Sequence, residues 1–196
     1  IISSVVPDLK DLFRELARHL FGHEPVIVGP EWYHLLEFNT SNPSEMGADL
    51  FANAVAAHHH LRADCVVVDF GTALTFTTLT AQGRVQGVVI APGLKTAMSA
   101  LFQKTAQLPE VPLELPDSAL GLNTVHAIQS GVLIGYVGLV RHMLERIRGE
   151  LGGHYRSIAT GGLSSILHPL QDAFDRIDPH LTLEGLRLIG ERANKS

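Results

Sequence analysis

The stretch "VVVDFGTALTF", residues 66–76, joins two strand-like runs through a short bend that contains an acid, a glycine and a threonine. The β-branched residues on both sides predict strands. In such a bend the glycine lets a ligand approach the backbone, and the backbone N–H groups can point at an anion. A carboxylate would repel a phosphate unless a cation lies between them, so Asp69 is a candidate ligand of Mg²⁺ at a nucleotide phosphate. Alternatively, Asp69 and Thr72 only cap a tight hairpin.

A second glycine pair, Gly161 and Gly162, lies in "ATGGL", residues 159–163, between an apolar run and a helical pattern. Paired glycines at a strand-to-helix junction let a ligand contact the backbone near a helix N-terminus. A purely structural turn explains this pair equally well. The two glycine sites together predict a nucleotide between a β-hairpin and a helix start. The chain has neither a Walker-type P-loop nor a Rossmann fingerprint.

Composition excludes several classes of protein. The 196 residues carry a formal net charge of -5 without a long basic run, which argues against nucleic acid as a partner. The single cysteine, Cys65, cannot form an intrachain disulfide, so a cytoplasmic location is expected. No apolar run approaches the ~20 residues of a membrane span, so no membrane association is expected.

Hydrophobic periodicity predicts alternating helices and strands. Three strand-like runs follow one another between residues 65 and 92, and most of the remaining chain has helical or irregular patterns. A strand hairpin followed by helices and strands predicts an α/β fold with a mixed sheet flanked by helices. The other expected elements are helices within 9–21 and 44–61, strands at 25–29 and 157–162, an irregular segment at 30–44, and a final short strand and helix.

A set of motifs in fixed order resembles the type III pantothenate kinases. The motifs are "ISSVVP" (2–7), "GADLFANAVAA" (47–57), "VVDFGTALTF" (67–76), "GVVIAPGLKTAMSAL" (87–101), "TAQLPEV" (105–111), "GLNTVHAIQSG" (121–131) and "ATGGL" (159–163). The resemblance implies the duplicated RNase H-like fold of the superfamily of acetate and sugar kinases, heat-shock chaperones and actin. Residues 1–62 would be the remainder of the N-terminal half, truncated at its N-terminus, and residues 63–196 the C-terminal half.

The resemblance also implies an activity and its partners. The activity would be ATP-dependent phosphorylation of pantothenate to 4'-phosphopantothenate, the first step of coenzyme A biosynthesis. It would use ATP, Mg²⁺ and a monovalent cation, K⁺ or NH₄⁺. The protein would be a homodimer with the pantothenate site at its interface.

Asp49 of "GAD" matches the catalytic carboxylate of the family. As a general base it would take the proton of the pantothenate hydroxyl during attack on the γ-phosphate. The remaining matched residues fall into three groups. They are Asp69, Gly71 and Thr72 in a phosphate loop, with Asp69 also near the metal; Gly161 and Gly162 on the adenosine side; and Gly47, Gly93, Leu94 and Thr124 at the substrate, Thr124 from the neighbouring subunit.

Three departures from the family pattern concern the substrate and phosphate sites. Leu50 stands where the family usually has an arginine that holds the pantothenate carboxylate, and Thr77 stands where an acid is common. The family's first phosphate loop, Asp-x-Gly-Asn-Thr, lies ahead of "ISSVVP", so the chain is expected to be about three quarters of such an enzyme. The alternatives are a catalytically impaired homologue that acts as an accessory or regulatory binding protein, and a superfamily kinase or phosphatase with another acceptor.

Two further features, the three histidines at 58–60 and Lys95, are most simply interpreted as surface residues. "HHH", residues 58–60, could bind a metal, but consecutive helical residues point in different directions, so an exposed helix end is favoured. Lys95 lies close to the substrate loop and could bind an anion, although a solvated surface lysine is favoured.

Overall fold

The chain forms two compact units in a computed structural model, which describes all residues except 5, 40–41, 105–107, 163–167 and 195–196. The first unit contains residues 1–65, 77–87 and 180–196, and the second contains residues 66–76 and 88–179. Parts of three sequence motifs, at Val5, 105–107 and Leu163, lie outside the described residues. The division into two RNase H-like halves, expected at residues 1–62 and 63–196, stays a prediction.

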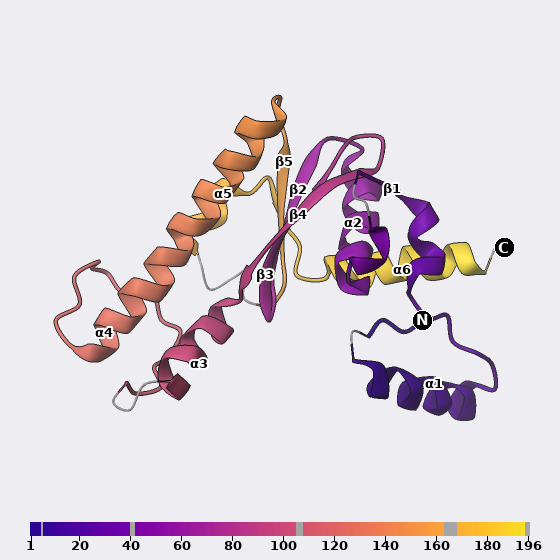
Figure 1. The fold of residues 1–196 in the computed structure, drawn as a ribbon, viewed down its shortest axis with the longest axis horizontal. Helices are drawn as coiled ribbons and strands as arrows, with labels where there is room; N and C mark the ends of the chain where they lie inside the picture. Colours follow the sequence, from indigo (N-terminus) through magenta and orange to yellow (C-terminus); the bar gives the residue numbers. More distant parts are fainter. Residues whose placement is uncertain (5, 40–41, 105–107, 163–167, 195–196) are drawn as a thin grey trace. The chain divides into compact units, whose positions relative to one another are not determined.

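Six strands form one sheet in the order β1-β4-β3-β2-β5-β6 (Figure 1). Both outer pairs, β1 with β4 and β5 with β6, are parallel. Short turns join β2 to β3 and β3 to β4, and such connections require antiparallel neighbours. The predicted mixed sheet is therefore confirmed. The strands are β1 (Glu37–Phe38), β2 (Cys65–Phe70), β3 (Ala73–Leu79), β4 (Arg84–Pro92), β5 (Arg156–Thr160) and β6 (Arg176–Ile177).

Helices flank this sheet. They are α1 (Pro7–Phe21), α2 (Ala48–Leu61), α3 (Leu94–Lys104), α4 (Thr124–Gln129), α5 (Gly135–Leu151) and α6 (Leu181–Ala193), with a π-helical turn at Ser130–Ile134 and 3₁₀ turns at Pro30–Leu35, Pro43–Glu45 and His168–Ala173.

The strand predicted at residues 25–29 is wrong in extent, since only an isolated parallel bridge between Ile2 and Ile27 is present there. The amide of Ile2 donates to the carbonyl of Val26, and the amide of Val28 donates to the carbonyl of Ile2. Pro25 has no N–H to extend the ladder.

In the first unit, α2 packs closely against α6. A β-carbon at Gly185 of α6 would lie 1.9 Å from the carbonyl oxygen of Ala52, so only glycine permits this approach of the two backbones. The hydroxyl of Thr182 donates to the buried side chain of Asn53 at 2.7 Å. These contacts hold the helix that carries Asp49.

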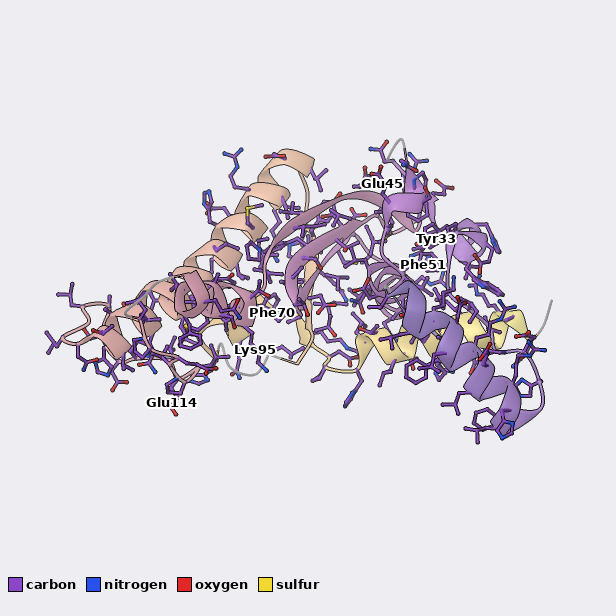
Figure 2. All side chains as sticks on the ribbon, turned by 60° about the horizontal axis from the view of Figure 1, so that its bottom comes forward. Tyr33, Glu45, Phe51, Phe70, Lys95 and Glu114 are labelled. Carbon is purple, nitrogen blue, oxygen red and sulfur yellow. The ribbon has the colours of Figure 1, made fainter. Side chains whose placement is uncertain are left out.

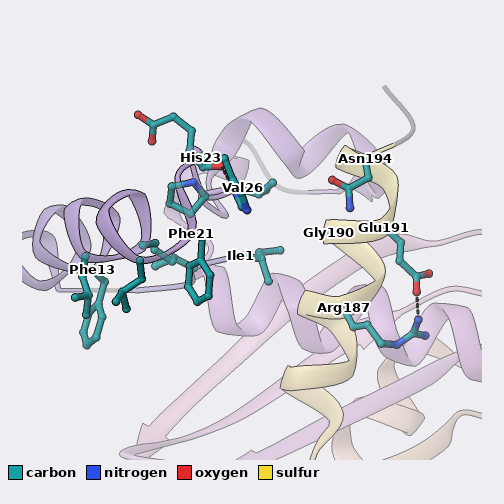
Figure 3. Close-up of a pocket in the computed structure, with 15 residues that line it drawn as sticks. Ile1, Phe13, Phe21, His23, Val26, Arg187, Gly190, Glu191 and Asn194 are labelled. Atoms are coloured by element: carbon teal, nitrogen blue, oxygen red, sulfur yellow. Dashed lines mark hydrogen bonds and ion pairs between the residues drawn. The ribbon is translucent and has the colours of Figure 1, made fainter.

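The helix α1 also belongs to the first unit. It ends at Gly22, which has a φ of 73°, and the Gly22 amide donates to the Arg18 carbonyl. A cavity of about 530 Å³ lies among α1, residues 23–26 and α6, and Figure 3 shows the side chains that line it. Phe13 and Phe21 contribute apolar surface, and Arg187 pairs with Glu191 beside it. None of the sequence-predicted site residues lines this cavity.

In the second unit, the first half of β3 and most of β2 form a core with β5 and α5. Phe70, Phe76 and Val140 are among its buried residues. The α4 helix continues through the π-helical turn into α5, and this stretch, Thr124–Leu151, is the one in the described residues with the length and composition to cross a membrane. Leu133, Val140 and Leu144 in it are buried, as in the core helix of a globular unit.

Candidate functional site

The turn between β2 and β3 forms the centre of the candidate site. Asp69 is half-buried near the end of β2, Phe70 is buried, and Gly71 and Thr72 make the connection to β3. The Gly71 amide donates to the Ala73 carbonyl at 3.1 Å. The hairpin predicted from the sequence is thus present, with the acid one residue before the strand end.

The turn after β5 lies directly against this hairpin. Gly161 has a φ of 92°, in the region that glycine favours. A β-carbon at this position would lie 2.6 Å from an Asp69 carboxylate oxygen and 2.8 Å from the backbone of Phe70. The two glycine sites predicted from the sequence therefore meet in one place, and Gly161 is what allows the two backbones to approach.

A third backbone segment, the start of α3, closes on the same turn. A β-carbon at Gly93 would lie 2.3 Å from the carbonyl oxygens of both Gly71 and Thr72. The Gly93 amide donates to the Thr72 carbonyl at 2.9 Å, and the Thr96 hydroxyl donates to the same oxygen at 2.7 Å. Leu94 is 2% exposed in the core, so only its backbone is available to a substrate.

A cavity of about 750 Å³ opens beside this turn and is lined from three segments of the second unit. Gly71 and Thr72 come from the hairpin, Gly162 from the turn after β5, and Lys95 from the first turn of α3. Figure 2 labels Phe70 and Lys95, two of its lining residues. The volume is in the range of small-molecule sites, and the single ammonium group in the lining suits an anion.

Gly47 and Asp49 lie at the start of α2, in the first unit. Gly47 is the N-cap, and Asp49 is exposed in the first helical turn, where a carboxylate interacts favourably with the helix dipole. The Asp49 carboxylate accepts the Leu50 amide at 2.9 Å. A β-carbon at Gly47 would lie 2.5 Å from that carboxylate, so glycine leaves room for it.

Tyr33 supports this helix start. Its ring packs 4.7 Å from that of Phe51, and its hydroxyl donates to the carbonyl of Met46 (Figure 2 labels Tyr33 and Phe51). Burial first, and then the negative charges of Asp49 and Glu31, raise the pKa of the Tyr33 hydroxyl above its ordinary value. The hydroxyl therefore stays protonated as a donor and holds the peptide that precedes Gly47.

The two positions that depart from the family pattern, Leu50 and Thr77, lie in the interior. Leu50 is 8% exposed and Thr77 is 1% exposed. A charged side chain at either position would have to be buried in this packing, which is costly unless it is paired. The missing family arginine is thus replaced by a core residue in this chain.

Thr124 does not line the cavity beside the hairpin. It is the first residue of α4 and lines another cavity of the second unit, of about 540 Å³, together with Leu122 and Ile128. Leu120 and Leu122 beside it are 80% and 93% exposed. Asn123 caps α4 by accepting the His126 amide at 2.9 Å.

No group of three or more His, Cys, Asp or Glu residues that could hold a metal occurs in the described part of the chain. Among the three consecutive histidines, His60 lies 3.8 Å from Glu184, and burial lowers the pKa of His58. Asp69 therefore offers one carboxylate, and Mg²⁺ at this place would need oxygen ligands from a bound nucleotide, as Mg²⁺ commonly has. The hairpin, the glycine contacts and the cavity fit such a group.

Two residues of the site were not selected from the sequence. Lys95 was interpreted as a solvated lysine, and its place in the cavity follows from the contact between α3 and the hairpin. Tyr33 lies in the segment expected to be irregular, and no local pattern reveals its bond to Met46. The proline-glycine pair at 92–93, followed by a helical pattern, was the available signal for Lys95.

Comparison with known sequences agrees with the order of the motifs. The family model described as type III pantothenate kinase matches residues 1–146. A type III pantothenate kinase of Treponema pallidum (strain Nichols) is 49% identical over 190 residues, which cover 96% of this chain and 69% of the relative. A type III pantothenate kinase of Moorella thermoacetica (strain ATCC 39073 / JCM 9320) is 40% identical over 192 residues, which cover 98% of this chain and 76% of the relative.

Solved structures resemble the fold at low sequence identity. A Campylobacter jejuni protein assigned to the Baf family of transcriptional activators matches with a TM-score of 0.63 at 21% identity, covering 98% of this chain and 81% of that one. The ethanolamine utilization protein EutJ of Carboxydothermus hydrogenoformans matches with a TM-score of 0.50 at 14% identity, and the match covers 93% of this chain and 74% of EutJ. These matches support the predicted RNase H-like fold of the actin-like ATPase type. The match over residues 1–146 and relatives with 40–49% identity along nearly the whole chain show that this chain belongs to the type III pantothenate kinase family.

Proposed function

We propose that the chain phosphorylates pantothenate with ATP, the reaction of its family, and that Asp49 acts as the general base. Asp49 is exposed at a helix start that Gly47 leaves open and Tyr33 fixes. In the reaction, the carboxylate takes the proton of the acceptor hydroxyl while its oxygen attacks the γ-phosphorus and the bond to the ADP oxygen breaks. Phosphoryl transfer depends mainly on position and charge stabilisation, so an ordinary carboxylate is a sufficient base.

The cavity beside the β2–β3 hairpin is the proposed nucleotide site, and its construction is the observation that carries the proposal. Three backbones meet there at distances that only Gly93 and Gly161 permit. Gly71 and Thr72 would contact phosphate through the hairpin, and Gly161 and Gly162 would border the adenosine side. When bound, Mg²⁺ supplies positive charge that neutralises the phosphates, and Asp69 is the residue that would hold it. A monovalent cation, K⁺ or NH₄⁺, is proposed near the same carboxylate.

For pantothenate binding, we propose Gly47 in the first unit and the Gly93–Leu94 backbone and Thr124 in the second unit. Since Leu50 is a buried core residue, the pantothenate carboxylate would need a cationic or amide partner other than residue 50. The comparisons contain nothing that favours an accessory binding protein over a kinase.

The direct test is Asp49→Asn in an ADP-release assay with pantothenate as acceptor. The amide keeps the shape of the carboxylate but cannot take the proton, so kcat should fall by ~10² or more while Mg-ADP affinity and the melting temperature stay unchanged. Asp64→Asn is the control for nonspecific effects, because Asp64 lies beyond the C-terminal end of α2, where its carboxylate accepts the Ala81 amide. Wild-type protein without pantothenate-dependent ADP release, or Asp49→Asn with full kcat, would contradict the proposal.

We also propose a closed homodimer built around α4 and α5, in which Thr124 contacts the neighbour's substrate. Leu120 and Leu122, exposed beside Thr124, give that end of the unit an uncovered apolar surface. Burial in a two-fold interface would remove it from water. Light scattering at tens of micromolar should show a dimer, and Leu122→Asp should shift it to monomer. A wild-type monomer under these conditions would refute this assembly. We place the enzyme in the cytoplasm, where a free thiol such as Cys65 stays reduced.

A further inference from the structure

The cavity beside the β2–β3 hairpin is lined by one ammonium group, that of Lys95. Of the residues that line this cavity, all in the described part of the chain, Lys95 alone carries a charge. Its side chain has no ion pair with any described residue, whereas most arginines of the protein are paired with acids. Lys95 therefore brings a positive charge to the lining of this cavity, beside a hairpin that also holds the Asp69 carboxylate.

The position of Lys95 follows from the pattern of α3. Leu94 and Met98 are buried on one face of the helix, while Lys95, Ser99 and Gln103, each four residues apart, line the cavity. Residues spaced by four lie on the same face of a helix. The contact of Gly93 with Gly71 and Thr72 sets this polar face against the hairpin, so Lys95 lines the same cavity as Gly71 and Thr72.

We propose that Lys95 binds the polyphosphate of the nucleotide and so determines the preference of this site for di- and triphosphates over monophosphates. This inference rests on the proposed nucleotide site. The polyphosphate is favoured over the acceptor's carboxylate because Lys95 shares its cavity with Thr72 and Gly162, while Thr124 lines another one. An ammonium group forms charge-assisted hydrogen bonds with phosphate oxygens.

The test compares Lys95→Gln with Lys95→Arg in the full chain, with Lys10→Gln as the matched control. Lys10 lies on α1 and does not line this cavity, so the same change in net charge is made elsewhere. Calorimetric titration with Mg-ADP and with AMP measures binding, and the ADP-release assay gives KM for both substrates. A thermal melt checks the fold of each variant.

We expect Lys95→Gln to weaken Mg-ADP binding and raise KM for Mg-ATP by about five- to thirtyfold, the range of one partly solvated charge-assisted contact. AMP affinity, KM for pantothenate and kcat should change by less than about threefold. Lys95→Arg should stay close to wild type because it keeps the charge, and Lys10→Gln should equal wild type. The dependence of Mg-ADP affinity on salt should be weaker in Lys95→Gln.

Three results would overturn the inference. They are an unchanged Mg-ADP affinity in Lys95→Gln, an equal loss for AMP, and an increase confined to the KM for pantothenate. The last result would assign Lys95 to the acceptor's carboxylate. Failure of the proposed function would look different, since a wild type that binds Mg-ADP through Lys95 but releases no ADP with pantothenate would refute only the kinase assignment. A wild type that binds no Mg-ADP would refute both.

Discussion

Substitution by alanine should destabilise the protein at Gly161 but leave its stability nearly unchanged at the adjacent Gly162. In Gly161→Ala the new β-carbon would lie 2.6 Å from the Asp69 carboxylate and 2.8 Å from the Phe70 backbone, at a φ of 92°. The backbone conformation alone costs about 1–2 kcal/mol for a residue other than glycine. Displacing the hairpin adds about as much again. The total of about 2–4 kcal/mol corresponds to a fall in melting temperature of about 4–16 °C for a chain of this size.

In Gly162→Ala the β-carbon meets no described atom within 4 Å, and the backbone is not in the left-handed region, so stability should change by less than about 0.5 kcal/mol. Urea unfolding and thermal melts of both variants measure these values, and Mg-ADP titration shows whether the displaced hairpin loses affinity. Gly161→Ala with wild-type stability and affinity would refute the close approach of the two turns. A large loss of stability in Gly162→Ala would contradict the open surroundings of Gly162.

Three further outcomes are expected. Leu50→Arg should lower the melting temperature by several degrees and should not lower KM for pantothenate, because the leucine side chain that it replaces is buried. A lowered KM would show that residue 50 reaches the substrate. Tyr33→Phe should lower the free energy of unfolding by about 1 kcal/mol, because it removes the hydroxyl that donates to Met46. It should lower kcat/KM for pantothenate more than it lowers the affinity for Mg-ADP. Equal losses would contradict a role of Tyr33 in placing Asp49. Cys65 should resist alkylation at pH 8 in the folded protein. Its burial, and to a smaller extent the charge of Asp64, raises the pKa of its thiol to about 12. Rapid labelling of Cys65 would contradict its burial.

Local patterns were sufficient to predict the hairpin and the glycine sites. The run from Val66 to Phe76 has the β-branched and aromatic residues of strands, and a two-residue turn with glycine leaves few alternatives for the chain. The meeting of Gly161 with Asp69 was predicted only as a shared nucleotide site, because a single sequence contains no direct signal for a contact between residues so far apart. The identity of Gly161 and of Gly93 as glycine is nevertheless explained by the distances.

Other features depended on tertiary packing and could not be predicted from the sequence. Leu50 was noted as the absence of an arginine, and its burial beside an exposed Asp49 is a property of how α2 packs. Tyr33 belongs to a proline-bounded segment without periodicity, and its hydroxyl reaches Met46 only through the fold of residues 30–46. Residues 25–29 have strand composition but form one bridge, since composition does not supply a partner for the ladder.

The carbonyl of Thr72 accepts two hydrogen bonds, from the Gly93 amide and from the Thr96 hydroxyl. A carbonyl oxygen has two lone pairs, so this one is saturated. It cannot serve as a ligand of a potassium or ammonium ion, and rotating its peptide plane to face such an ion would break both bonds. A cation bound beside this turn must therefore take its oxygens from other groups, such as the Asp69 carboxylate, the nucleotide or water, while the Thr72 peptide stays fixed to the start of α3.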